Sequence, residues 1–113
     1  MEKIKIIKSD EIIKTSTSHD KNIYKNVIIS NNTIPHIFQF AFTIFKKGDK
    51  IEIHSHPSAY EVFYIEYGKI TLLTEDERII LTDNDSFIVP PNCIHGLEIL
   101  EETKIIYFLS SSK

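Results

Sequence analysis

The sequence predicts an all-β fold built from many short strands, and two observations support this prediction. First, the chain holds 22 isoleucines against only two alanines, together with seven phenylalanines and five tyrosines. β-Branched and aromatic side chains suit a pleated sheet, whereas alanine is the strongest helix former. Second, short apolar runs alternate with turn residues, and no run repeats with the period of a helix. This pattern is typical of a β-sandwich or a β-barrel.

The expected strands are less regular at the start of the chain than in the rest of it. Ile4 and Ile6 alternate with lysines in a first short strand, residues 23–29 form a second, and the polar residues 14–22 form a loop between them. The later strands are expected at residues 37–45, 51–56, 60–67, 70–74, 79–82, 86–89, 94–99 and 104–109. The turns between them include a charged turn at 46–50, a tight turn at 68–69, a proline turn at 90–92 and a polar turn at 101–103.

The length of 113 residues predicts a single domain. Within it, we expect residues 1–33 to form an N-terminal arm of edge strands and residues 34–113 to form the barrel. The arm is expected to pair along a sheet edge, either in its own barrel or in that of a partner. No internal repeat or linker divides the chain.

Composition argues against several functional classes. The formal net charge of −3 disfavours non-specific binding to nucleic acid, which requires a basic surface. Three glycines cannot supply a dinucleotide-binding or phosphate-binding loop, and the single cysteine, Cys93, excludes an internal disulfide framework. Charged residues interrupt the apolar positions of residues 1–14, so no signal peptide or membrane span is visible there. We therefore expect no nucleic-acid or membrane partner and a cytoplasmic location.

Three histidines and one glutamate are the candidate functional residues. His54 and His56 are two residues apart on an expected strand, so both side chains lie on one face. Glu61 would face the opposite side of an unbroken strand, but Pro57 interrupts the ladder and allows the carboxylate to be redirected. A return strand after the proline turn would bring His95 alongside. Three imidazoles and one carboxylate suit a divalent first-row transition metal.

The sequence around these residues resembles the two motifs of the cupin family. The run from Gly48 to Gly68 matches the first motif, G-x5-H-x-H-x4-E-x6-G, at every defining position. Residues 84–99 resemble the second motif, G-x5-P-x-G-x2-H-x3-N, through Pro90 and His95. The departures from the second motif are Asn84, Asn92 and Ile99. Because asparagine tolerates a left-handed backbone better than other non-glycine residues, we expect the two Gly-to-Asn departures to be mild.

This resemblance implies a fold, a site and a class of function. The fold is the cupin double-stranded β-helix, a single-domain jelly-roll barrel that is commonly a homodimer. The site is a 3-His-1-Glu set of His54, His56, Glu61 and His95, holding iron, manganese, nickel or zinc. The function is that of a metal-dependent enzyme acting on a small-molecule substrate, as a dioxygenase, isomerase or lyase, with Glu61 also acting as a catalytic base. The alternative is a non-catalytic cupin module that binds a metal or a small molecule.

Two further expectations concern the surroundings of the site. Phe63, Ile65 and Leu97 are expected to line a pocket, which favours a small, largely apolar or planar ligand. Cys93, two residues before His95, is expected to be a small buried packing residue rather than a fifth metal ligand.

Overall fold

The computed structural model describes residues 2–18, 20 and 22–113, and within these residues it contains eight β-strands and no α-helix. The strands are β1 (Ile13–Ser16), β2 (Tyr24–Ile29), β3 (Ile37–Phe45), β4 (Lys50–His54), β5 (Ala59–Thr74), β6 (Arg78–Thr82), β7 (Ser86–Val89) and β8 (His95–Ser111). A short 3-10 turn, η1 (Ser9–Glu11), precedes β1. The prediction of an all-β fold is confirmed. In the described part of the chain, no helix has the length and apolar character needed to cross a membrane.

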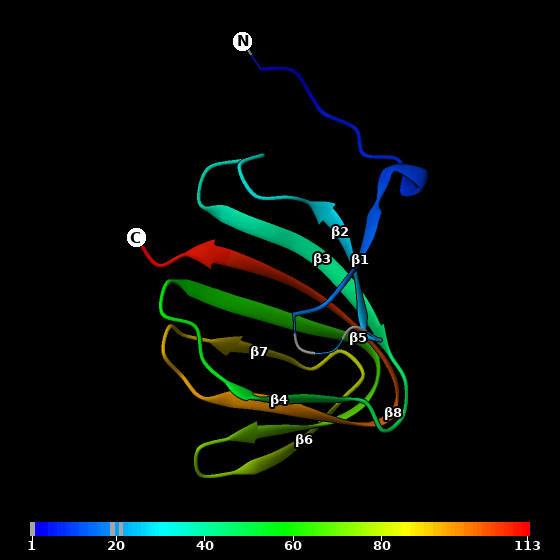
Figure 1. Cartoon of the computed structure of the whole chain (residues 1–113), viewed down its shortest axis with the longest axis vertical. Coiled ribbons are helices and arrows are strands. Elements are labelled where there is room, and N and C mark those ends of the chain that lie inside the picture. Colours follow the sequence, from blue (N-terminus) through cyan, green and yellow to red (C-terminus); the bar gives the residue numbers. More distant parts are fainter. Residues whose placement is uncertain (1, 19, 21) are drawn as a thin grey trace.

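Strands β5 and β8 form the centre of the fold. Their antiparallel ladder runs from Ala59 opposite Ser111 to Thr74 opposite His95. β3 pairs with the later part of β8, while β4 pairs with its beginning. In the same way, β7 pairs with the first half of β5 and β6 with its second half. Figure 1 shows β5 and β8 curving together from one layer of strands into the other, which produces the jelly-roll arrangement.

The curve is located at a β-bulge in the ladder. Register shifts occur between Ile65 and Ile70 on β5, and Gly68 lies among them with a φ of 122°. A Cβ atom at Gly68 would overlap the backbone and side chain of Thr103 on β8, which is fully buried. The Thr103 hydroxyl accepts the N–H of Lys69 at 3.0 Å and donates to the Glu101 carbonyl at 2.8 Å. This close contact is possible because residue 68 has no side chain.

Two predicted turns are therefore wrong. Neither residues 68–69 nor residues 101–103 reverse the chain; both lie inside long continuous strands that bend. Turn residues at a bulge and turn residues in a hairpin have the same composition, and the sequence alone did not separate them. The expected proline turn at 90–92 is present, and a polar turn at 83–85 joins β6 to β7. Asn84 and Asn92 adopt the left-handed conformation with φ of 69° and 67°.

The N-terminal segment also differs from the prediction. Ile4 and Ile6 lie in an exposed segment without regular pairing, and β1 occupies part of the expected loop 14–22. Two residues of that loop, His19 and Lys21, lie outside the described residues. β1 pairs with β2 and β2 pairs with β3, so this arm extends the edge of its own sheet. Ile23, only 3% exposed, anchors the arm in the core.

The core lies between the two layers and is made mostly of isoleucine. Its buried members are Ile23, Phe45, Ile51, Ile65, Ile70, Leu72, Leu97, Ile99 and Ile105. Ile99, which stands where the second cupin motif has asparagine, is one of them and is 3% exposed. The departure from the motif is therefore accommodated by packing.

Replacement of Gly68 by alanine is expected to destabilise the fold by about 3 kcal/mol or more, because the new Cβ would overlap the Thr103 backbone at a positive φ. Gly48→Ala is the matched control: Gly48 also has a positive φ, 91°, but open space surrounds it. Its cost is expected to be the left-handed strain alone, between about 1 and 2 kcal/mol. Urea unfolding of both variants measures the difference, and equal losses would contradict this account of the bend.

Candidate metal centre

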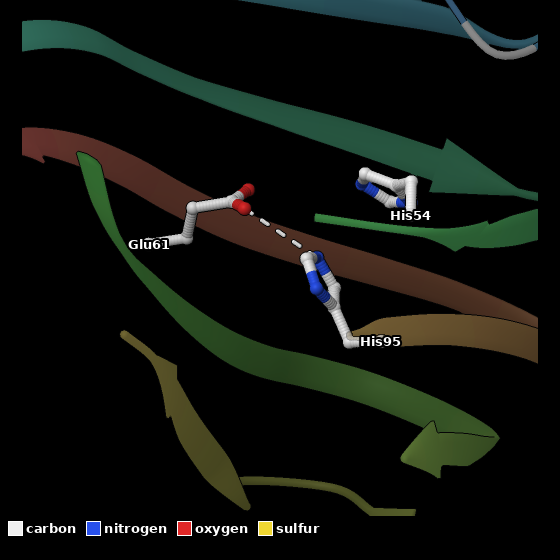
Figure 2. A group of neighbouring side chains, drawn as sticks. All are labelled: His54, Glu61 and His95. Atoms are coloured by element: carbon white, nitrogen blue, oxygen red, sulfur yellow. Dashed lines mark ion pairs between the residues drawn. The ribbon is translucent and has the colours of Figure 1, made fainter. Parts of the chain in front are cut away.

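Three side chains from three strands converge in the interior of the barrel. His54 ends β4, Glu61 lies near the start of β5 and His95 begins β8. Their ligand atoms all lie within 4.8 Å of one another, and Figure 2 shows the three side chains pointing toward a common space. His54 and His95 are direct partners in the register of β4 and β8.

Glu61 reaches this group only because the β5–β8 ladder folds over. His95 is opposite Thr74, at the other end of β5 from Glu61. A straight strand from Glu61 to Thr74 would separate them by roughly 40 Å. The bend at Gly68 brings Glu61 Oε1 to 3.4 Å from His95 Nε2 instead.

Backbone carbonyls set the orientation of two of the imidazoles. Nδ1 of His54 lies 2.7 Å from the Glu52 carbonyl oxygen, and Nδ1 of His95 lies 3.0 Å from the Cys93 carbonyl oxygen. A carbonyl only accepts, so Nδ1 carries the proton in each ring, and Nε2 is the acceptor nitrogen when the ring is neutral. Metal-binding histidines are commonly held by this kind of bond from the nitrogen that does not coordinate the metal.

The contact between His95 and Glu61 requires a positive charge. Nε2 of His95 is buried and forms no hydrogen bond with any described residue, although Glu61 Oε1 is 3.4 Å away. A neutral Nε2 and a carboxylate oxygen are both acceptors, and burying them face to face is unfavourable. Either a proton on Nε2 or a metal cation between the two atoms resolves this conflict. The donor set therefore fits a divalent transition metal, as the sequence predicts.

His56 lies at the edge of the group. It follows β4 in the loop before Pro57, and its Nε2 is 3.5 Å from Glu61 Oε1. Its side chain is 40% exposed, against 5% for that of His95. The His56 ring is 6.2 Å from the His95 ring, whereas the His54 ring is 4.3 Å away. The tight cluster consequently contains two histidines and the glutamate, and the fourth member of the 3-His-1-Glu set stays a prediction.

The loop that carries His56 is fastened to the turn that precedes His95. The backbone N–H of Asn92 donates to the His56 carbonyl at 2.7 Å. This bond joins the segments of the two motifs directly, and the left-handed conformation of Asn92 aims its N–H at that carbonyl.

Burial and mutual charge shift the pKa values in this group. Burial opposes ionisation of Glu61, yet the neighbouring histidines, His95 foremost, hold its pKa below the usual value. Burial likewise opposes protonation of His95, but the contact with Glu61 raises its pKa. For His54, burial dominates and lowers the pKa. In the metal-free protein the pair therefore favours a negative Glu61 and a positive His95.

A cavity of about 160 Å³ opens beside these residues, and its walls are largely apolar. Phe63 stacks on Phe87 at 4.7 Å between ring centroids, and Tyr107 lies 5.6 Å from Phe63 on the other side. The Tyr107 hydroxyl is 3.3 Å from Thr43 Oγ1. Burial raises the pKa of Tyr107, so the phenol stays neutral.

The structure corrects two expectations about the surroundings of the site. Phe63 and Leu97 line the cavity as predicted, but Ile65 is fully buried in the core and does not line it. Cys93 is exposed, so the prediction of a buried packing residue is wrong. Cys93 belongs to the turn that places its carbonyl against His95, and a turn at the surface leaves the thiol outside.

The sequence analysis missed the polar residues of β2 and β3 that face the cavity. Lys25, Gln39 and Thr43 all line it. Gln39 and Thr43 lie between apolar residues in a strand that is apolar on both faces, and Lys25 is followed by the polar Asn26. Neither pattern indicates which face of the strand points inward.

The sequence model of the Cupin domain family matches residues 41–110. Quercetin 2,3-dioxygenase of Bacillus subtilis is 38% identical over 50 residues, which are 44% of this chain and only 15% of that protein. An uncharacterised protein of Methanocaldococcus jannaschii is 26% identical over 96 residues, covering 84% of this chain and 77% of its own length.

Solved structures share the fold over nearly the whole chain. A predicted oxalate decarboxylase of Thermotoga maritima superposes with a TM-score of 0.81, covering 95% of this chain and 99% of that one, at 15% identity. KdgF of a Halomonas species superposes with a TM-score of 0.76, covering 96% and 95% of the two chains, at 20% identity. At these identities the structures establish the fold and leave the chemistry open.

The His95–Glu61 pair predicts how the stability of the metal-free protein depends on pH. A raised folded-state pKa at His95 adds stability that is present below its unfolded value and is lost as pH rises through the folded value. With a chelator present, the melting temperature is therefore expected to fall as the pH rises above the ordinary histidine pKa of about 6.5. In Glu61→Gln, which removes the charge and keeps the shape, this fall should be smaller. Parallel pH dependence of the two proteins would contradict the pairing.

Proposed function

The chain belongs to the cupin domain family, and we propose that it is a metal-dependent enzyme that acts on a small-molecule substrate. The observation that carries this proposal is the buried pair of acceptor atoms, His95 Nε2 and Glu61 Oε1, with His54 beside them. Two acceptors at 3.4 Å in a buried position need either a proton or a metal cation between them, and the nearby His54 supplies a further ligand for a metal. The metal ligands proposed are His54, Glu61 and His95, with His56 as the fourth.

The donor set suits iron, manganese, nickel or zinc, because imidazole and carboxylate ligands bind all four. A metal bound here would act as a Lewis acid on an oxygen of the substrate. The chain contributes the rest: the Glu52 and Cys93 carbonyls fix two imidazoles, and Glu61 supplies a negative charge. The largely apolar cavity walls lower the local dielectric and strengthen these charge interactions.

Glu61 has a second proposed role as a proton acceptor. It is ionised at neutral pH and is only 6% exposed, with Phe63 two residues further on the same face. A carboxylate released from the cation in this apolar setting would become a stronger base, because burial disfavours its charged form. Its lowered pKa in the present geometry suits the role of ligand first.

Among the dioxygenase, isomerase and lyase types of reaction, the local similarity to quercetin 2,3-dioxygenase supports testing dioxygen chemistry first. The similarity covers less than half of this chain, so we do not propose that this chain acts on the substrate of that enzyme. The homodimer and the cytoplasmic location expected from the sequence stay predictions.

Purified protein is expected to bind a divalent metal in a near-stoichiometric amount, measured by elemental analysis after reconstitution with iron, manganese, nickel or zinc. His54→Gln and His95→Gln should each lower the metal affinity by at least tenfold, because each removes a proposed ligand while keeping a similar volume. His56→Gln should have a smaller effect, since His56 lies at the edge of the cluster. At a metal concentration of a hundred times Kd, the wild type should gain about 2.7 kcal/mol of stability.

His36→Asn is the matched control for the metal experiment. His36 is exposed, lies outside the cavity and has a φ of 69°, which asparagine tolerates. It should bind metal as the wild type does. Unchanged metal content in His54→Gln and His95→Gln, with both variants folded, would reject the site. A failure of every tested metal to bind the wild type under reducing conditions would reject the proposed function.

A further inference from the structure

The wall of the cavity beside the metal centre also contains polar residues of the N-terminal arm. Thr17, Ser18 and Lys25 line the cavity, and all three lie outside the region that matches the family. The sheet register explains why Lys25 faces inward. Val27 is opposite Ala41, and Ala41 is opposite Tyr107, which lines the cavity. Residues two apart share a face, so Lys25 points to the same side as Val27.

Small side chains on β3 leave space beside Lys25 in the cavity. Ala41 is fully buried in the row between Val27 and Tyr107, and Thr43, two residues further, also faces the cavity. Larger residues at these two positions would fill the space between Lys25 and Tyr107. The chain has only two alanines, and one of them is placed here.

The arm is held in a defined position above the cavity. Ile23, two residues before Lys25, is packed in the core cluster. The turn before it is closed by the Thr17 hydroxyl, which donates to the Asp20 carbonyl at 2.9 Å and accepts the Asp20 N–H at 3.1 Å. These contacts hold the backbone at Lys25 in place beside the cavity.

The charge of Lys25 has no carboxylate partner within ion-pair distance among the residues that the structure describes. The one acidic group that lines the cavity, Glu61, contacts His56 and His95 instead. Lys25 is half-buried, and an ammonium group beside apolar walls is stabilised by an anion placed against it. With a divalent metal bound by His54, Glu61 and His95, the cavity would carry a net positive charge, which favours an anionic ligand.

We infer that the cavity binds a small, planar organic carboxylate, with the carboxylate paired to Lys25 and the remainder of the ligand lying between the aromatic wall and the metal centre. The inference deepens the proposed function and rests on it for the role of the metal. Phe63, Phe87 and Tyr107 form a continuous aromatic part of the cavity wall, which suits a planar apolar ring. The volume of about 160 Å³ matches a ligand of roughly the size of benzene, which fills a cavity of about 150 Å³.

Benzoate is the probe for this inference, compared with benzamide and benzyl alcohol, which have similar shapes and no charge. Binding is measured by calorimetry and by NMR chemical shifts of the metal-free protein, and again after loading with zinc. Wild-type protein should bind benzoate at least tenfold more tightly than either neutral compound, because a charged hydrogen bond to Lys25 is lost with them. Lys25→Met should reduce benzoate affinity by about tenfold or more and leave benzamide affinity nearly unchanged.

Two control variants accompany Lys25→Met. Lys25→Arg keeps the positive charge and should retain the preference for benzoate over benzamide. Lys47→Met removes an exposed lysine of the turn between β3 and β4 and should behave as the wild type. Circular dichroism checks that all variants are folded, and Lys25→Gln replaces Lys25→Met if the latter does not fold.

The outcomes separate this inference from the proposed function. Benzoate affinity unchanged in Lys25→Met, or equal affinity for benzoate and benzamide in the wild type, would overturn the assignment of Lys25. Absence of binding by all three probes, in a protein that binds metal, would also overturn it while leaving the metal site in place. Benzoate binding that depends on Lys25 in a protein that binds no metal would support the ligand class and reject the metal-dependent function.

Discussion

The bend of the β5–β8 ladder at Gly68 is the constraint on which the rest of the structure depends. The two strands are paired along nearly their whole length, and at Gly68 the backbone of β5 lies against Thr103 with no room for a side chain. Because of this bend, one pair of strands belongs to both layers of the barrel. The core is enclosed between the two halves of a single ladder, and Glu61 and His95, at opposite ends of it, meet in the interior.

The site that results is governed by electrostatics in a buried place. Two backbone carbonyls fix the protons of His54 and His95 on Nδ1, and Nε2 of His95 lies 3.4 Å from Glu61 Oε1. Without a cation, the group depends on a proton on His95, which accounts for the raised pKa of that residue and the lowered pKa of Glu61. A metal ion and a proton therefore compete for the same position, and metal binding is expected to release protons.

The N-terminal arm adds polar and charged side chains to the cavity wall. The candidate metal ligands lie within the region that matches the family, whereas Lys25 lies before it, on a strand that pairs with the edge of the barrel. Barrel interiors of this kind can keep the metal chemistry constant while edge strands change the shape and charge of the opening. In this chain, the arm contributes a cation and two hydroxyls, and β3 leaves space for them with Ala41 and Thr43.

The sequence by itself determined the β-rich class, the order of most strands and the residues that form the candidate site. Alternating apolar residues and the H-x-H-x4-E spacing are local signals, because each depends only on residues that are near one another in the chain. Most of the strands and the candidate site that they predicted are therefore found in the structure. Only the tertiary structure decided that residues 68–69 and 101–103 are bends within strands, that Cys93 is exposed and that His56 stands apart from the tighter group. It also decided that Lys25 faces the cavity. These features depend on which strands pair and in what register, and contacts between residues far apart in the chain leave no periodic trace in the sequence.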